Sequence, residues 1–142
     1  MTITIDQMLE AARTTIDRIY AFELPEAIAR GAILVDIRPQ AQREREGVLP
    51  GALAIERNVL EWRLDPSSSA RIGLAKDHDV EWIIVCSEGY TSSLAAASLQ
   101  QLGLHRATDL VGGYKAIQAA GVRNVAIGAR HFAQLSEVFA AH

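Results

Sequence analysis

Apolar and polar residues alternate along the chain in blocks whose spacing predicts a succession of helices and strands. Two short apolar runs, 32–37 (AILVDI) and 80–86 (VEWIIVC), are typical of strands buried on both faces. Shorter extended segments are expected near residues 18–21, 52–56 and 107–113. The spacing of apolar residues between the strands, with proline and glycine at helix ends, predicts helical segments over 5–17, 24–30, 58–64, 92–102, 114–120 and 131–141. The charged run 40–46 (QAQRERE) is expected to be an exposed helical piece.

This order of elements indicates the fold class. Strands separated by helical segments of about 8–12 residues predict an α/β domain with a mainly parallel sheet flanked by helices on both faces. A chain of 142 residues is long enough to bury one core and short for two. Residues 1–142 are therefore expected to form a single domain, in which the N-terminal helix and the tail from Gly121 onward are extensions.

Composition and charge narrow the classes of partner. A formal net charge of −3 offers no general basic surface for nucleic acid or an anionic membrane. No apolar run approaches the ~20 residues that cross a bilayer, and the N-terminus lacks the basic start and apolar run of a signal peptide. The four histidines are scattered without the spacing of metal ligands. We expect a cytoplasmic protein with no metal, cofactor, membrane or nucleic-acid partner, and we leave its oligomeric state open.

The single cysteine, Cys86, is the strongest candidate for chemistry. It excludes a disulfide within the chain and a cysteine-rich zinc site. Cys86 ends a predicted parallel strand, where α/β proteins bind their ligands, and the loop after it leads directly into a helix. Gly89 gives this loop the freedom to curl its amides around the sulfur, and Thr91 or Ser92 can cap the helix. Such surroundings favour a thiolate, although a buried core cysteine is also common at this kind of position.

Four ordered motifs then carry a resemblance to a known family. They are the loop Cys86–Ser92 with its central glycine, the Asp-x-Arg of residues 35–38, the Pro-Gly-Ala turn of residues 47–52, and the Gly-Gly-aromatic turn of residues 110–114. Over about residues 18–120 the chain resembles the rhodanese-like single-domain sulfurtransferases. The resemblance implies a five-stranded, mainly parallel sheet, and transfer of sulfane sulfur from thiosulfate or a persulfide donor to a thiol or protein acceptor.

The resemblance also implies roles for particular residues. Cys86 is expected to be the catalytic residue that carries the persulfide, and no cofactor is implied. Arg38 is expected to be structural and paired with an acid such as Glu46, with Asp36 in a supporting role near the loop. The substrate is expected to meet the loop that follows the cysteine, which consists of Ser87, Glu88, Gly89, Tyr90, Thr91 and Ser92.

This sequence departs from the family pattern at one point, because many relatives carry a cation inside the loop and this chain carries none. Glu88 is expected to face outward, where it does not repel an anionic donor. Arg57 and Arg63, and also Arg71, can supply the missing charge at the mouth of the site, or they can form ordinary surface ion pairs. Trp62 and Trp82 are expected in the core and Tyr90 on the surface of the loop.

Two other functions stay open. Phosphatases and arsenate reductases of the Cys-x5-Arg type grip the oxyanion with an arginine, but Ser92 stands at that place here. We therefore expect neither phosphatase nor arsenate reductase activity. A non-catalytic binding or regulatory module of the same fold is the second alternative, and Cys86 argues against it because such modules usually lack the cysteine.

Overall fold

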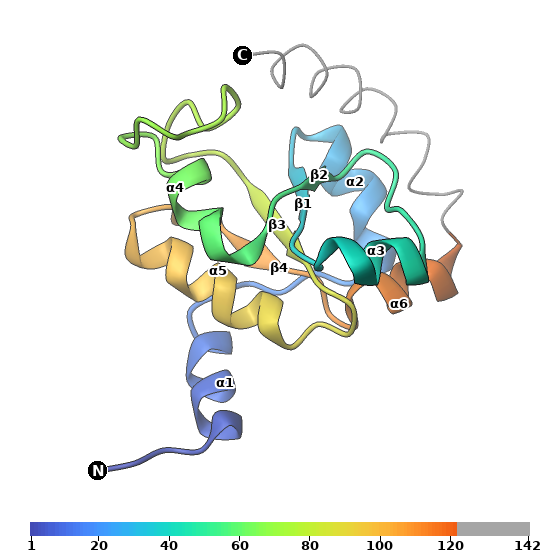
Figure 1. Ribbon diagram of the computed structural model, residues 1–142, viewed down its shortest axis with the longest axis horizontal. Helices are drawn as coiled ribbons and strands as arrows, with labels where there is room; N and C mark the ends of the chain where they lie inside the picture. The colour runs from blue at the N-terminus through green and yellow to red at the C-terminus, as the bar shows by residue number, and fades with distance from the viewer. Residues whose placement is uncertain (122–142) are drawn as a thin grey trace.

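A parallel sheet of four strands forms the centre of the computed structural model, which describes residues 1–121 (Figure 1). The strand order is β2-β1-β3-β4, and every neighbouring pair is parallel. The strands are short, as expected for a sheet covered on both faces: β1 (Ile33–Asp36), β2 (Leu53–Ala54), β3 (Trp82–Val85) and β4 (Thr108–Asp109).

The expected fifth strand is not formed. The segment near residues 18–21 makes an isolated parallel bridge, in which Ile19 pairs with Leu110 just beyond β4. The chain then leaves the sheet, because Ala21–Glu23 form a 3-10 helix that leads directly into a helix with Pro25 in its first turn. The five-stranded expectation is thus corrected to four strands with one flanking bridge.

The helices agree with the predicted segments to within four residues at either end. The predicted first helix, 5–17, ends at Arg13, because the chain turns there toward the sheet and Ile16 is buried. The predicted helix 131–141 lies outside the described residues. The helices are α1 (Ile5–Arg13), α2 (Leu24–Ala29), α3 (Gln40–Glu46), α4 (Leu60–Leu64), α5 (Thr91–Gln101) and α6 (Gly113–Ala120), with 3-10 turns at Ala21–Glu23 and Arg57–Val59.

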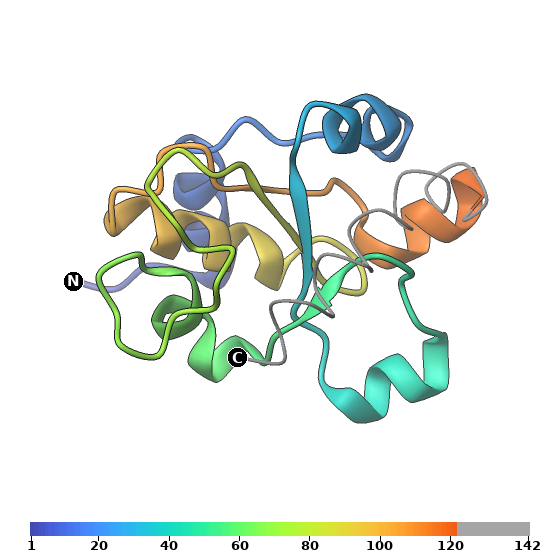
Figure 2. The ribbon, with the colours of Figure 1, turned by 90° about the horizontal axis from the view of Figure 1, so that it is seen from above.

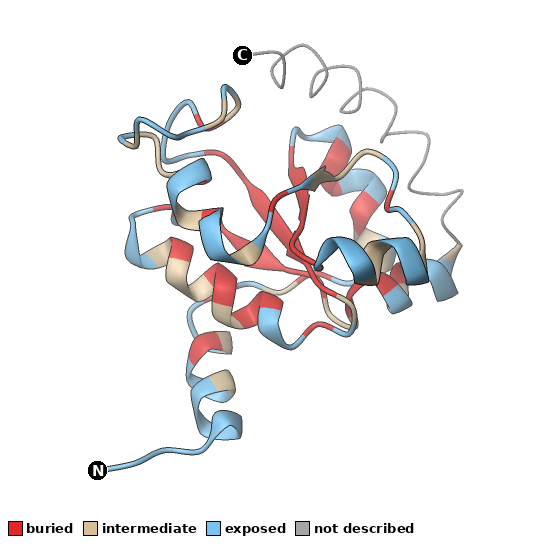
Figure 3. Cartoon of the chain, in the orientation of Figure 1, coloured by how far each residue is buried: buried red, intermediate tan, exposed pale blue. Residues whose placement is uncertain are grey.

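Two apolar clusters lie on opposite faces of the sheet. Successive residues of a strand point to opposite faces, so that Ile84 belongs to the cluster with Leu60 and Leu99, while Ile83 belongs to the cluster with Leu24 and Ile117. Helices α4 and α5 cover the first face, and α2 and α6 cover the second (Figures 1 and 2). Strands β1, β3 and β4 are buried along their length, whereas the edge strand β2 is not (Figure 3).

The two tryptophans differ in their environment. Trp82 is fully buried, as predicted. The prediction for Trp62 is wrong, because this residue is 61% exposed. Leu60 and Leu64, four residues apart, occupy the buried face of the short helix α4, which leaves the position midway between them on the solvent side.

Candidate active site around Cys86

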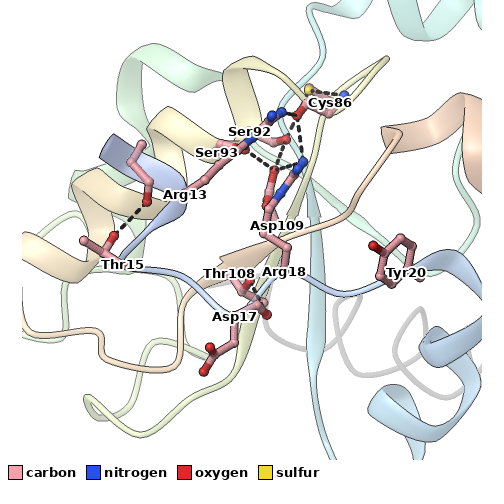
Figure 4. Close-up of polar contacts among 12 residues, drawn as sticks. Arg13, Thr15, Asp17, Arg18, Tyr20, Cys86, Ser92, Ser93, Thr108 and Asp109 are labelled. Carbon is pink, nitrogen blue, oxygen red and sulfur yellow. Dashed lines mark hydrogen bonds and ion pairs between the residues drawn. The ribbon is translucent and has the colours of Figure 1, made fainter. Parts of the chain in front are cut away.

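Cys86 follows the last residue of β3 and lies at the carboxyl edge of the sheet, with α5 beginning at Thr91 (Figure 4). Gly89 adopts a φ of +86°, and a Cβ at this position would lie 2.7 Å from the Gly112 amide nitrogen. Glycine is needed here because a side chain would meet both backbone strain and a backbone contact. The expected glycine-centred loop between strand and helix is present.

Two polar groups contact the sulfur. The Gly89 amide donates a hydrogen bond to Sγ at 3.2 Å, and the Cys86 thiol donates to the Ser92 hydroxyl at 3.2 Å. Fewer loop amides reach the sulfur than expected. Within residues 1–121, Gly89 provides the one backbone amide that hydrogen-bonds it. Cys86 itself is 5% exposed, and Val35 and Ala95 belong to the same apolar cluster. The site therefore combines a covered sulfur with one polar side.

The Gly-Gly turn closes the loop from the other side. The amide of Tyr114 donates to the Cys86 carbonyl at 2.8 Å, and the amide of Lys115 donates to the Ser87 carbonyl at 3.1 Å. Both amides belong to the first turn of α6, whose free N–H groups need acceptors. The start of α6 is thereby joined to the start of the Cys86 loop.

Asp109 is the centre of a polar network that the sequence analysis missed. It is fully buried, and its Oδ2 atom accepts hydrogen bonds from the hydroxyls of Ser92 and Ser93, each at 2.7 Å (Figure 4). Arg18 donates to both carboxylate oxygens, at 2.8 and 3.2 Å. The position of Asp109 at the end of β4, beside the Gly-Gly turn, could have indicated that it lies near Cys86. The carboxyl ends of neighbouring parallel strands meet at one edge of a sheet.

Ser92 thus has a role other than the expected one. The residue before α5, Tyr90, makes no side-chain cap, and neither Thr91 nor Ser92 caps this helix. Ser92 is fully buried, and its hydroxyl lies between the sulfur of Cys86 and the carboxylate of Asp109. Thr91, the first residue of α5, is exposed.

The remaining loop side chains point away from the sulfur. Ser87 donates to both carboxylate oxygens of Glu46, at 3.0 and 2.9 Å. Glu88 faces outward as expected and pairs with Lys115 at 2.7 Å, a hydrogen bond that raises the pKa of the lysine. Tyr90 is 59% exposed, in agreement with the prediction.

Arg38 has the expected structural surroundings. Its buried guanidinium contacts Asp36 at 2.7 Å and Glu46 at 3.2 Å, and it lies 3.9 Å from the ring centre of Tyr114. Burial opposes the charge on Arg38, but the hydrogen bond and attraction of Asp36, followed by those of Glu46, raise its pKa above the usual value. Asp36 therefore supports Arg38, and through Glu46 the pair is connected to Ser87 in the loop.

Of the arginines considered either for the mouth of the site or for surface ion pairs, Arg57 and Arg63 both make contacts within their own segment. Arg57 pairs with Glu61 at 2.9 Å, four residues further on, and Arg63 donates to the Ala70 carbonyl at 3.1 Å. A place for either residue beside the substrate stays a prediction. Over residues 1–121 there is no group of three histidine, cysteine, aspartate or glutamate side chains suited to a metal ion, and no helix of the length and apolarity that a bilayer crossing requires.

Comparison with known families agrees with this geometry. Residues 21–120 match the family described as Rhodanese-like domain. The chain belongs to this family. The rhodanese-like domain thus includes the Cys86 loop, Arg38 and the Gly-Gly turn, whereas α1 and Arg18 lie before the matched region. No curated protein matches the sequence.

Solved structures place the rhodanese-like domain among known folds. A protein of unknown function from Rhodopseudomonas palustris, described as a possible tyrosine phosphatase, is 30% identical, with a TM-score of 0.75 over 85% of this chain and 93% of that chain. A rhodanese homologue from Thermus thermophilus is 27% identical, with a TM-score of 0.52 over 70% and 99%. A rhodanese-related protein from Thermoplasma volcanium shares the fold at 23% identity, with a TM-score of 0.56 over 73% and 92%.

Proposed function

We propose that this rhodanese-like domain is a sulfurtransferase that moves sulfane sulfur from thiosulfate or a persulfide donor to a thiophilic acceptor through a persulfide on Cys86. The observation that carries the proposal is the Gly89 amide directed at the sulfur of the only cysteine, in the loop between β3 and α5 of the matched domain. An N–H donor at this distance stabilises a negative sulfur, both in the free thiolate and in the Cys86–S–S⁻ group. In this proposal the protein acts in the cytoplasm, where it meets both the donor and the acceptor.

The proposed reaction is a double displacement. With thiosulfate, the Cys86 thiolate attacks the outer sulfur, a Cys86–sulfur bond forms, and sulfite leaves with the electron pair of the broken sulfur–sulfur bond. A thiolate acceptor then attacks the outer sulfur of the persulfide. The acceptor leaves as a persulfide, and the Cys86 thiolate is regenerated.

Ser92 supports this chemistry through its single hydroxyl hydrogen. With Cys86 as a thiol, the Ser92 hydroxyl donates to Asp109 and accepts from the sulfur. After loss of the thiol proton the hydroxyl can rotate and donate to the thiolate. Asp109 then keeps its hydrogen bonds from Ser93 and Arg18, so that this rotation leaves no buried carboxylate without partners.

Intact-mass measurement tests the proposal directly. Incubation of the full chain with thiosulfate or another sulfane donor is expected to add one sulfur atom to the protein, and cyanide is expected to remove it. Cys86→Ala is expected to gain no mass. Ser69→Ala, an exposed serine of the loop between α4 and β3, is the control and is expected to gain the same mass as the unaltered protein. The absence of an adduct with every donor tried would contradict the proposal.

The description of one relative as a possible tyrosine phosphatase makes a second assay necessary. In this chain the place of the phosphatase arginine is held by Ser92, whose neighbour is the Asp109 carboxylate. A serine cannot give a phosphate the two-bond cationic contact that an arginine provides. We expect no hydrolysis of an aryl phosphate. Partner binding that is retained in Cys86→Ala, together with no adduct in the unaltered protein, is the result expected of a non-catalytic module.

A further inference from the structure

Two arginines from the segment before the matched domain reach the Cys86 loop (Figure 4). Arg13, at the end of α1, donates to the Gly89 carbonyl at 2.8 Å, and Arg18 donates to the same oxygen at 2.9 Å. The amide of Gly89 contacts the sulfur of Cys86. Gly89 thus donates a hydrogen bond to the reacting sulfur through its N–H and accepts hydrogen bonds from two guanidinium groups at its carbonyl oxygen.

Further contacts hold both arginines in place. Arg18 forms a two-bond ion pair with the buried carboxylate of Asp109, and the carbonyl of its neighbour Asp17 accepts a hydrogen bond from the Thr108 hydroxyl at 2.8 Å. Arg13 donates to the Ser93 hydroxyl at 3.0 Å. Two-bond pairing of guanidinium and carboxylate restricts orientation as well as distance. The N-terminal segment is therefore attached both to the loop and to β4.

The two arginines differ in whether their positive charge is paired with a carboxylate. The charge of Arg18 is balanced by Asp109. Arg13 forms no ion pair with any of the residues that the structure describes, and its guanidinium carbon lies 5.7 Å from the ring centre of Tyr90. The loop itself contains one charged residue, Glu88, which is neutralised by Lys115. Arg13 is thus a cation without a direct ion pair among the described residues, beside a loop that contains no cation.

We propose that Arg13 and Arg18 are positioning residues of the Cys86 site, and that Arg13 supplies the positive charge that the loop lacks. Both arginines hold the Gly89 carbonyl, which keeps the Gly89 amide on the sulfur. Arg18 also holds Asp109, which orients the Ser92 hydroxyl. The charge of Arg13 favours an anionic sulfur donor. The role of Arg13 toward an anionic sulfur donor rests on the proposed sulfurtransferase function. The positioning of the loop by the two arginines does not depend on that function.

Alkylation of Cys86 tests the charge. Iodoacetate and iodoacetamide are similar in size and differ in charge, so the ratio of their rates reports the potential at the sulfur. In the full chain, Arg13→Gln is expected to lower the iodoacetate-to-iodoacetamide ratio by about two- to fivefold, and Arg13→Lys to restore most of it. Arg45→Gln, an equal charge change at an exposed position of α3, is expected to leave the ratio unchanged. An equal ratio in Arg13→Gln and the unaltered protein would overturn the role of Arg13.

Amide hydrogen exchange tests the positioning. Arg18→Gln is expected to speed exchange across residues 86–93 by about tenfold or more while β1 stays protected, and Arg18→Lys is expected to lie between the two. A merely destabilised fold would raise exchange in both regions together. Arg13→Gln keeps the test decisive if Arg18→Gln does not fold, since it removes one Gly89 contact and no ion pair. Unchanged exchange in the loop of Arg13→Gln, with Arg18→Lys also unchanged, would refute the positioning role.

The two proposals fail in different ways. Neither alkylation nor hydrogen exchange requires a sulfur donor. A protein that forms no persulfide but shows both effects would refute the sulfurtransferase function and support the positioning of the loop. A protein that forms the persulfide equally well with and without the two arginines, at an unchanged alkylation ratio, would refute the arginine roles alone.

Discussion

At Gly113 the backbone has a φ of +63°, directly beside the Cys86 loop. A Cβ here would overlap the Cys86 carbonyl oxygen and would lie 2.7 Å from the Ser87 carbonyl oxygen. These are the carbonyls that receive the first amides of α6, so the turn can approach them only without a side chain. The second glycine of this turn is therefore required by contact as well as by conformation.

We expect Gly113→Ala to lower the free energy of unfolding by about 3 kcal/mol or more, because strain and a backbone clash add together. Gly31→Ala is the matched control. Gly31 also has a positive φ, +103°, but a Cβ there meets nothing within 4 Å, so we expect a loss of about 1–2 kcal/mol from strain alone. Urea unfolding of the two variants measures the difference. Equal losses would show that the contact at Gly113 is unimportant.

At the scale of elements, α3 is joined to the rest of the site through its last residue, Glu46. This carboxylate accepts hydrogen bonds from Ser87 in the loop and from Arg38 after β1. Partial burial works against the charge of Glu46. The hydrogen bonds from Ser87, Arg38 and Gln42 outweigh it, and the pKa of Glu46 lies below its usual value of 4.5. The helix, the strand end and the loop therefore share one ionised group.

This connection predicts a pH dependence. A carboxyl whose pKa is lower in the folded than in the unfolded protein stabilises the fold above pH 4.5, and this contribution is lost as pH falls through the folded pKa. Ser87→Ala removes the largest hydrogen-bond contribution, so we expect it to be less stable than the unaltered protein at pH 7 and the difference to narrow as the pH falls below 4.5. Urea unfolding across this range provides the measurement. Ser69→Ala, at an exposed position of the loop between α4 and β3, is the control. A gap that is constant with pH would contradict the assignment.

The elements themselves were largely predictable, and their ends were not. The spacing of apolar residues located α2, α5 and both central strands, and the charged run 40–46 indicated α3. It overextended α1 and suggested a fifth strand, because an apolar residue such as Ile16 or Ile19 is buried equally well by a helix, a strand or an irregular segment. Trp62 shows the same limit, since a helix of five residues has too few apolar positions to indicate which side faces the core.

In the molecule as a whole, the sheet separates two apolar layers. Ile84 lies in the layer under α5, and Ile117 lies in the layer under α6. Each side chain is fully buried. We expect Ile84→Val and Ile117→Val each to cost about 0.5–1.5 kcal/mol, and the double variant to equal their sum within about 0.5 kcal/mol.

Paired variants within one layer are the comparison for this experiment. Ile84→Val and Leu99→Val share the same cluster, and their effects are expected to depart from additivity by more than those of the pair on opposite faces. Thermal or urea unfolding of the single and double variants measures both sums. Strong coupling between Ile84 and Ile117 would contradict the description of two independent layers.

The sequence alone determined the fold class, the position of Cys86 at a strand end, and the glycine-centred loop after it, because these depend on residues close together in the chain. Tertiary structure alone decided which groups surround the sulfur. Asp109, Arg18 and Arg13 come from β4 and the N-terminal segment, and folding brings the two arginines to residues 71 to 91 positions further along the chain, such as Gly89 and Asp109. Local patterns of polarity contain no information about such pairings, because a buried carboxylate is chosen by the partners that it meets after the sheet has formed.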